Sequence, residues 1–166
     1  MSYILTVPYT KLISLPPNEG IMYSPRLPTA LELGSCRTQF SFPSVVDSGA
    51  DYCIFPLEFG ERLGIDFKNL QSSPASGFGG GGHCFYHKIN VLVVVENLGL
   101  KFECFAGFSD QMDKLGIGLL GRHGFFELFE EVIFDQRNRV FKLKVPGERP
   151  INSSQTPANS PAASSS

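Results

Sequence analysis

The sequence predicts an all-β fold, and three observations lead to this prediction. The 166-residue chain contains 15 phenylalanines and no tryptophan, together with many valines and isoleucines, and these residues favour strands over long helices. Seventeen glycines and 12 prolines recur along the chain and divide its apolar pattern into short segments. Many short strands with few helices indicate a closed or nearly closed barrel.

The composition is that of one ordinary domain. With 42% hydrophobic residues the chain can bury a core without the help of metals or disulfides. We expect the folded unit to span residues 1–145, with residues 1–28 as an N-terminal extension or extra strand. Residues 146–166 are rich in Ser, Pro and Ala, and we expect them to form a disordered tail.

In the first half of this unit, turn signals separate short apolar segments. Pro56 stands at a suitable first helical position, and Leu57, Phe59 and Leu63 follow in loose helical spacing, so we expect a short helix over 56–63. Strands are expected at 3–8, 29–33, 38–42, 45–47 and 54–55, and a loop around 16–20 follows the first of them.

The second half continues with strands and one further helical segment. Val132 to Asp135 and Val140 to Val145 should form a hairpin whose turn is 136–139. The other strands are expected at 70–77, 84–95, 100–108 and 117–120, and a brief helix at 125–129.

Charge and segment lengths exclude several classes of protein. The net charge is -2, and lysine and arginine are scattered, which argues against nucleic acid or an anionic membrane as a partner. No apolar stretch approaches the roughly 20 residues that a bilayer crossing requires. Residues 1–7 lack the features of a secretory signal, so we expect a cytoplasmic protein.

The four cysteines, Cys36, Cys53, Cys84 and Cys104, are widely spaced. In a reducing compartment we expect buried or half-buried thiols. His83, Cys84 and His87 could supply metal ligands or a thiol nucleophile, but strand alternation places His83 and Cys84 on opposite faces, and no fourth ligand has useful spacing. We therefore expect no metal and no cofactor.

Three further segments could carry chemistry. The sequence Val-Val-Asp-Ser-Gly-Ala at 45–50 places a carboxylate directly after an apolar strand, which by itself is ordinary turn chemistry. The tract at 77–82 contains five glycines and suits a hairpin that opens over a ligand. It lacks the Gly-Lys-Ser/Thr ending of a phosphate loop. The sequence Gly-Leu-Leu-Gly-Arg at 118–122 ends an apolar strand at a turn.

Taken in this order and spacing, the three segments resemble the retropepsins, the single-domain aspartic proteases of retroviruses and their cellular and bacterial relatives. The resemblance covers roughly residues 29–145. In retroviral members a second acid follows the motif and pairs with the arginine after the late glycine. Asp51 and Arg122 match these positions, so the resemblance implies an ion pair between them.

The resemblance implies a retropepsin-like barrel and a homodimer, because the chain holds one Asp-Ser-Gly whereas the chemistry needs two carboxylates. Asp47 of each subunit would share a proton and activate a water, and the 77–82 hairpin would form a flap over the substrate. The implied catalytic residues are Asp47, Ser48 and Gly49; the substrate-binding residues are Ala50, Asp51, Gly77, Phe78, Gly79, Gly80 and Gly81; the supporting residues are Leu119, Leu120, Gly121 and Arg122.

The implied activity is that of an aspartic endopeptidase acting on extended polypeptides. The alternative is a catalytically inactive dimerisation or peptide-binding module of the same fold. Two departures from the family bear on this choice. The flap tip lacks the aliphatic residues that many relatives place between its glycines, with Phe78 as a substitute, and the segment before Thr29 is longer than in a minimal retroviral protease. The role of that segment stays open between an inhibitory segment, an extra strand and a dimer interface.

Overall fold

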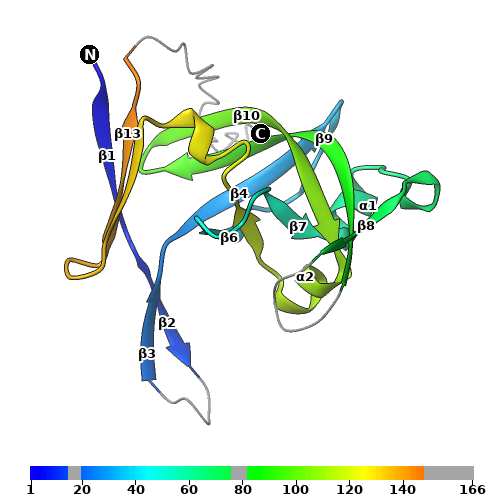
Figure 1. Ribbon diagram of the computed structural model, residues 1–166, viewed down its shortest axis with the longest axis horizontal. Helices are drawn as coiled ribbons and strands as arrows, with labels where there is room; N and C mark the ends of the chain where they lie inside the picture. The colour runs from blue at the N-terminus through cyan, green and yellow to red at the C-terminus, as the bar shows by residue number, and fades with distance from the viewer. Residues whose placement is uncertain (15–19, 76–81, 148–166) are drawn as a thin grey trace, which may run out of the picture.

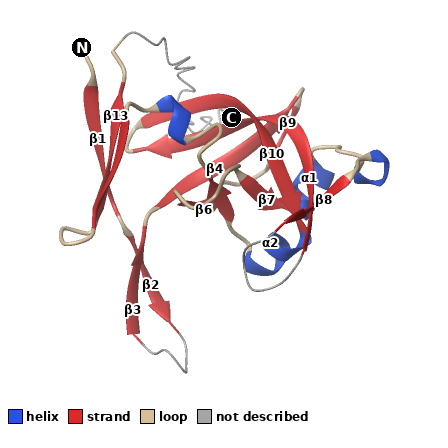
Figure 2. Cartoon of the chain, viewed as in Figure 1, coloured by secondary structure: helices blue, strands red, loops and turns tan. Residues whose placement is uncertain are grey.

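A computed structural model describes residues 1–14, 20–75 and 82–147 of the chain. Strands make up most of the molecule, and the helices are short and lie at its periphery (Figure 2). None of the helices among the described residues has the length and apolar character that a membrane crossing requires.

Six strands close a barrel, which confirms the predicted all-β architecture. In their order around the barrel they are β4 (Arg26–Leu33), β6 (Phe42–Val46), β11 (Gly118–Leu120), β7 (Ile54–Pro56), β10 (Leu98–Ser109) and β9 (Gly82–Val95). The ring closes because β9 also pairs with β4, in an antiparallel register that places Thr29 opposite Val93. Each of these six strands therefore has a hydrogen-bonded neighbour on both sides.

Alternating side chains on the two longest strands build the barrel core. Along β9, Ile89, Val91, Val93 and Val95 are at most 2% exposed, and the residues between them face outward. On β10 the buried positions likewise recur at every second residue from Leu100 to Ala106. This period of two matches the pleat, so burial of one face fixes the register of the pair.

A three-stranded sheet lies beside the barrel (Figure 1). It contains β1 (Tyr3–Pro8), β13 (Val140–Val145) and β12 (Glu131–Asp135), with β13 in the middle. The first and last of the described strands thus pair with one another, and Phe141 and Leu143 join the same apolar core as the barrel strands. The predicted hairpin of β12 and β13 is confirmed.

A second hairpin flanks the segment where the sequence predicted a loop. Strands β2 (Thr10–Ser14) and β3 (Gly20–Ser24) pair as a separate two-stranded sheet, and the sequence did not predict these two strands. The turn signals at 16–20 fall mostly on residues 15–19, outside the described residues. The strands were missed because both faces carry apolar side chains, without the alternation that marks a half-buried strand.

The predicted first helix is confirmed as α1 (Leu57–Arg62), and the segment expected at 125–129 forms a 3-10 helix, η2 (Phe126–Leu128). Two further helical segments were not predicted: η1 (Phe67–Asn69) and α2 (Asp110–Leu115). Local capping defines α2. The Ser109 hydroxyl accepts a hydrogen bond from Gln111 N at its start, and Gly116 ends it with a left-handed φ of 60°.

The prediction of a strand at 38–42 was wrong. The chain forms the two-residue edge strand β5 (Cys36–Arg37) and then turns, and only Phe42 of the predicted strand belongs to the barrel. Phe40 is 75% exposed, so the segment buries no continuous face. Cys36 on this edge is exposed, which corrects its prediction as a buried or half-buried thiol, whereas the other three cysteines are buried.

Two predictions fall partly beyond the described residues. The strand expected at 70–77 is found as β8 (Ser72–Ala75), which pairs antiparallel with β9, and residues 76 and 77 lie outside the description. The tail expected from residue 146 lies outside it from residue 148 onward.

Candidate active site

Asp47 lies in a loop whose two ends are held by one strand. The loop leaves β6 after Val46 and enters β7 at Ile54, and β11 lies between these two strands in the barrel. Strand β11 pairs in parallel with β6, with Leu120 opposite Val46, and antiparallel with β7, with Leu119 opposite Ile54. The start and the end of the loop are therefore fixed relative to each other.

Hydrogen bonds within the loop orient the Asp47 carboxylate. Asp47 N donates to Leu120 O at 3.1 Å, and Asp47 Oδ1 accepts from Gly49 N at 2.8 Å. Ala50 N donates to Asp47 O at 3.3 Å, which closes a tight turn. A Cβ on Gly49 would lie 3.2 Å from Asp47 Oδ1, so glycine leaves the carboxylate its space. Asp47 is half-buried and Ser48 is exposed.

The residues after β11 cross directly beneath the far side of this loop. Arg122 N donates to Ala50 O at 2.9 Å, and His123 N donates to Asp51 O at 2.8 Å. At Gly121 the two segments are so close that a Cβ would overlap the carbonyl group of Tyr52 and lie 2.9 Å from Ala50 O. The glycine in the late motif thus permits the contact that joins the two motifs.

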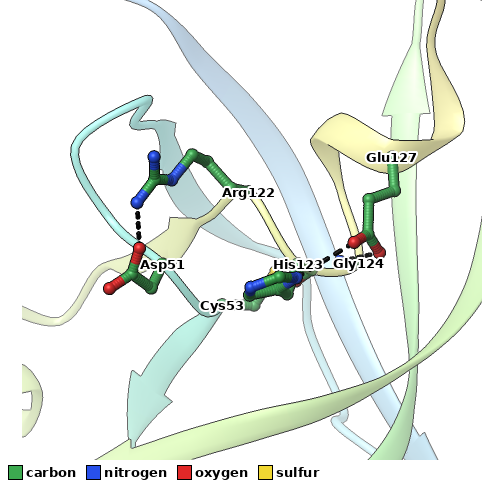
Figure 3. Close-up of polar contacts among 6 residues, drawn as sticks. All are labelled: Asp51, Cys53, Arg122, His123, Gly124 and Glu127. Atoms are coloured by element: carbon green, nitrogen blue, oxygen red, sulfur yellow. Dashed lines mark hydrogen bonds and ion pairs between the residues drawn. The ribbon is translucent and has the colours of Figure 1, made fainter.

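The predicted ion pair between Asp51 and Arg122 is confirmed (Figure 3). Arg122 Nη2 donates to Asp51 Oδ1, and both side chains remain about 60% exposed. An exposed pair contributes little to stability, typically about 0 to 1 kcal/mol. Its structural effect is to join the loop that begins at Asp47 to the segment that follows β11.

A neighbouring polar contact fixes the chain just beyond this pair. The Glu127 carboxylate accepts a hydrogen bond from Gly124 N at 3.1 Å and lies 3.0 Å from His123 Nδ1, and Figure 3 shows this group beside the Asp51–Arg122 pair. The His123 ring is thus held between the Glu127 carboxylate and the ring of Tyr52, whose centre lies 5.1 Å away.

A cleft of about 460 Å³ opens in front of the Asp47 loop. The loop supplies one wall, the base of the β8–β9 hairpin a second and α2 a third. Among the predicted site residues, Asp47, Gly49, Ala50, Asp51 and Leu119 line it, whereas Leu120 is fully buried beneath the loop. The other lining residues, which were not among the site residues implied by the resemblance, are Tyr52, Ile54, Pro74, Cys84, Tyr86, Ser109, Gln111 and Met112.

Tyr86 is a tyrosine of the cleft whose pKa is raised. Burial raises the pKa of Tyr86 to about 12, and the neighbouring Cys84, Tyr52 and Asp51 act in the same direction. The ring lies 5.3 Å from that of Tyr52 and stacks at 5.5 Å on Phe105, so aromatic surface continues from the cleft onto the outside of β10.

The predicted flap is described only at its base. Strands β8 and β9 pair as far as Ala75 opposite Gly82, and Gln111 of α2 packs against Gly82. The predicted substrate-binding residues of the tip, Gly77, Phe78, Gly79, Gly80 and Gly81, lie outside the described residues.

The alternative metal or thiol site receives no support from the geometry. His83 hydrogen-bonds with Ser72 on the edge strand β8, and His87 Nδ1 lies 2.9 Å from Lys88 O. Cys84 is buried and burial raises its pKa, which disfavours the reactive thiolate. Within residues 1–14, 20–75 and 82–147, no group of three or more His, Cys, Asp or Glu side chains is placed to hold a metal ion.

Comparison with known proteins gives a structural match without a sequence match. No family model matches the chain, and no curated protein sequence does. Among solved structures, the chain is similar to a retropepsin-like aspartic protease from Rickettsia conorii, with a TM-score of 0.52 and 17% sequence identity over 87% of this chain and 92% of that one. At this identity the likeness shows the fold alone, and the fold is a retropepsin-like barrel.

Proposed function

We propose that the chain is an aspartic endopeptidase that acts as a homodimer. The observation that carries the proposal is the position of Asp47, which faces a cleft from a loop fixed at both ends by β11. The Asp51–Arg122 ion pair supports it, because it joins the two motifs whose spacing suggested the family. The retropepsin-like fold supports it as well.

The proposed reaction needs two carboxylates, and the chain has a single Asp-Ser-Gly. Two copies related by a two-fold axis would bring two Asp47 side chains together. Carboxylates about 3 Å apart share one proton, because both cannot ionise cheaply. Each subunit would then contribute one residue of a single site.

In this dyad the ionised Asp47 takes a proton from a bound water, and the water oxygen attacks the scissile carbonyl carbon. The protonated Asp47 donates its proton to the carbonyl oxygen, which gives a neutral tetrahedral diol. The first carboxyl group then returns its proton to the leaving nitrogen as the carbon–nitrogen bond breaks, and the second carboxylate recovers its proton from the diol. No metal or cofactor enters the cycle.

The local structure suits this role. The hydrogen bond from Gly49 N holds Asp47 Oδ1 in place before substrate binds, so little reorganisation is needed during the reaction. Gly49 and Ala50 are small and line the cleft, which allows a peptide backbone to approach the carboxylate. We assign Ser48 a supporting role at the dyad, and Leu119, Leu120 and Gly121 the role of its scaffold.

The proposed substrate is an extended polypeptide with apolar side chains beside the scissile bond. Ile54, Met112 and Leu119 are apolar residues of the cleft lining, and Tyr52 and Tyr86 are its aromatic residues. A substrate lying as an added strand would gain main-chain hydrogen bonds. Gly77 to Gly81, with Phe78, would cover it as a flap, and Asp51 would border the groove.

The experiment compares the wild type with Asp47→Asn on a peptide library read by mass spectrometry at several pH values. We expect Asp47→Asn to lose cleavage by at least about a thousandfold while it keeps the fold and the dimer, since an amide cannot share the proton of the dyad. Glu61→Gln is the matched control, because it removes one exposed carboxylate outside the cleft.

Two outcomes would contradict the proposal. Cleavage by Asp47→Asn at the wild-type rate would show that the activity lies elsewhere. A wild-type dimer that captures peptides and cuts none of them between mildly acidic and neutral pH would favour the inactive peptide-binding module.

A further inference from the structure

Within the part of the chain that the structure describes, the β2–β3 hairpin, which we call the arm, projects from the molecule without a covering layer (Figure 1). Among these residues its two strands pair only with each other, and β2 is opposed to β3 over five residue pairs from Thr10–Ser24 to Ser14–Gly20. An isolated two-stranded hairpin is marginally stable in water. The arm is therefore an element that gains stability from a surface outside its own sheet.

Both faces of the arm carry exposed apolar side chains. Ile13 and Ile21 are paired on one face and are 82% and 56% exposed. Leu12 and Met22 are paired on the other, and Met22 is 56% exposed. Hairpins that face water on one side keep that side polar. Apolar pairs on both faces therefore indicate that both faces of the arm are covered by protein when the arm is bound to a partner surface.

The base of the arm, in contrast, is fixed to the body of the protein. Arg139, at the turn between β12 and β13, places its guanidinium 3.9 Å from the centre of the Tyr23 ring. Tyr9 N donates to Arg139 O at 2.7 Å, and Arg26 Nε donates to Ser24 Oγ at 3.3 Å. These contacts set the direction in which the arm leaves the barrel.

That base adjoins the Asp47 loop. Val46 N, one residue before Asp47, donates to Pro25 O at 2.8 Å, and Pro25 directly follows the end of β3. From this point a strand of five residues extends roughly 16 Å at about 3.3 Å per residue. A second copy that brings its own Asp47 to this carboxylate would therefore come close to the start of the arm.

We infer that the arm is a dimerisation element that packs its apolar side chains against a second copy of this chain, beside the paired Asp47 loops. The inference rests on the proposed function, because the dyad is what brings the second copy to this place. By symmetry each subunit gives one arm and receives one, so every apolar pair of the arm counts twice in the interface. The arm would thus link assembly of the dimer to completion of the site.

The test compares the dimer dissociation constant of the full-length wild type with that of Ile13→Thr/Ile21→Thr by sedimentation equilibrium. Threonine keeps the β-branched shape that suits a strand and makes the side chain polar. We expect the dissociation constant to rise at least about tenfold, because four buried isoleucines are lost per dimer. Val94→Thr is the matched control: it makes a similar change at a residue 46% exposed on β9 and should leave the constant within about twofold.

A second variant and a cross-linking experiment test whether a weaker dimer could instead result from local misfolding of the arm. Met22→Gln changes the opposite face of the arm and should weaken the dimer as well, while both arm variants keep the thermal unfolding midpoint of the monomer. A photo-reactive amino acid installed at Ile13 should form a covalent dimer on irradiation. At high protein concentration Ile13→Thr/Ile21→Thr should recover cleavage, because its Asp47 is intact, whereas Asp47→Asn should not.

The outcomes separate the inference from the proposed function. If the wild type is an active dimer and the arm variants dimerise as tightly as it does, the inference about the arm would be overturned, and the proposal of an aspartic dyad would be unaffected. If the arm variants dimerise more weakly than the wild type but the wild type cleaves no peptide, the role of the arm in dimerisation would be supported and the proposed protease activity would be contradicted. A wild type that remains monomeric at about 100 times the enzyme concentration used in the assays would overturn both.

Discussion

Gly121 is the residue at which the two segments of the candidate site come closest. Its backbone angle is unexceptional, so space rather than conformation requires the glycine: a Cβ would overlap the Tyr52 carbonyl. The atoms that a Cβ would overlap belong to the backbone of the Asp47 loop. This backbone is hydrogen-bonded to the segment after β11, as between Arg122 N and Ala50 O, so moving it aside would cost free energy. A methyl group here would push the Asp47 loop away from the strand that holds it.

We therefore expect Gly121→Ala to lower the free energy of unfolding by about 1 to 3 kcal/mol and to reduce cleavage far more than this loss of stability explains. Urea unfolding and kcat measured on the folded protein would check both. Gly99→Ala is the control, since nothing lies within 4 Å of a Cβ at Gly99 and its φ is not positive. Equal effects of the two variants would contradict this account of the crossing.

At the scale of elements, α2 carries residues of the cleft although it is only six residues long. Met112 is 2% exposed, and Gln111 packs on Gly82 at the base of the β8–β9 hairpin. A helix this short gains little from its own hydrogen bonds, so its caps matter. Ser109 begins it and Gly116, at a φ of 60°, ends it.

Gly116→Ala should cost about 1 kcal/mol of stability, because the left-handed conformation is strained for a residue with a Cβ, even though the space around Gly116 is open. Since α2 forms a wall of the cleft and holds no reacting group, we expect KM to rise while kcat changes little. Steady-state kinetics on one peptide substrate would test this split, and a fall in kcat with an unchanged KM would contradict it.

The elements that the sequence predicted well are those with a long period of two. Strands β9, β10 and β13 each bury every second residue over most of their length, and their positions were predicted to within two residues. The arm lacked this alternation, and α2 was too short for a helical period, although Ser109 and Gly116 are recognisable as its caps. Burial of one face over several residues thus makes a strand recognisable from its local pattern.

The residues of the candidate site likewise fall into two groups, those that the sequence identified and those that it did not. Asp47, Asp51 and Arg122 belong to short motifs, so they could be identified in the sequence, and the ion pair was correctly expected. Tyr86 and Met112 reach the cleft through the pairing of β9 with β10 and the packing of α2, which no local motif encodes. The position of β11 between β6 and β7 is a property of the closed sheet, and no single segment predicts it.

At the scale of the whole molecule, one dyad shared between two chains predicts how mixtures behave. An equal mixture of wild type and Asp47→Asn, allowed to exchange subunits, should show about half the activity of the same amount of wild type alone, because half of the wild-type chains then sit in mixed, inactive dimers. Measuring activity at fixed wild-type concentration against added variant would reveal the loss. An unchanged activity would mean that each chain works by itself.

The pairing of β11 with both β6 and β7 also sets an order of events during synthesis. Residues 47–53 leave the ribosome well before Gly118–Leu120, yet Asp47 N finds its acceptor only at Leu120 O. Contacts of such long sequence separation form late, after the intervening chain has been made. A nascent chain that stops short of residue 118 therefore carries an Asp47 loop without the strand that fixes both of its ends.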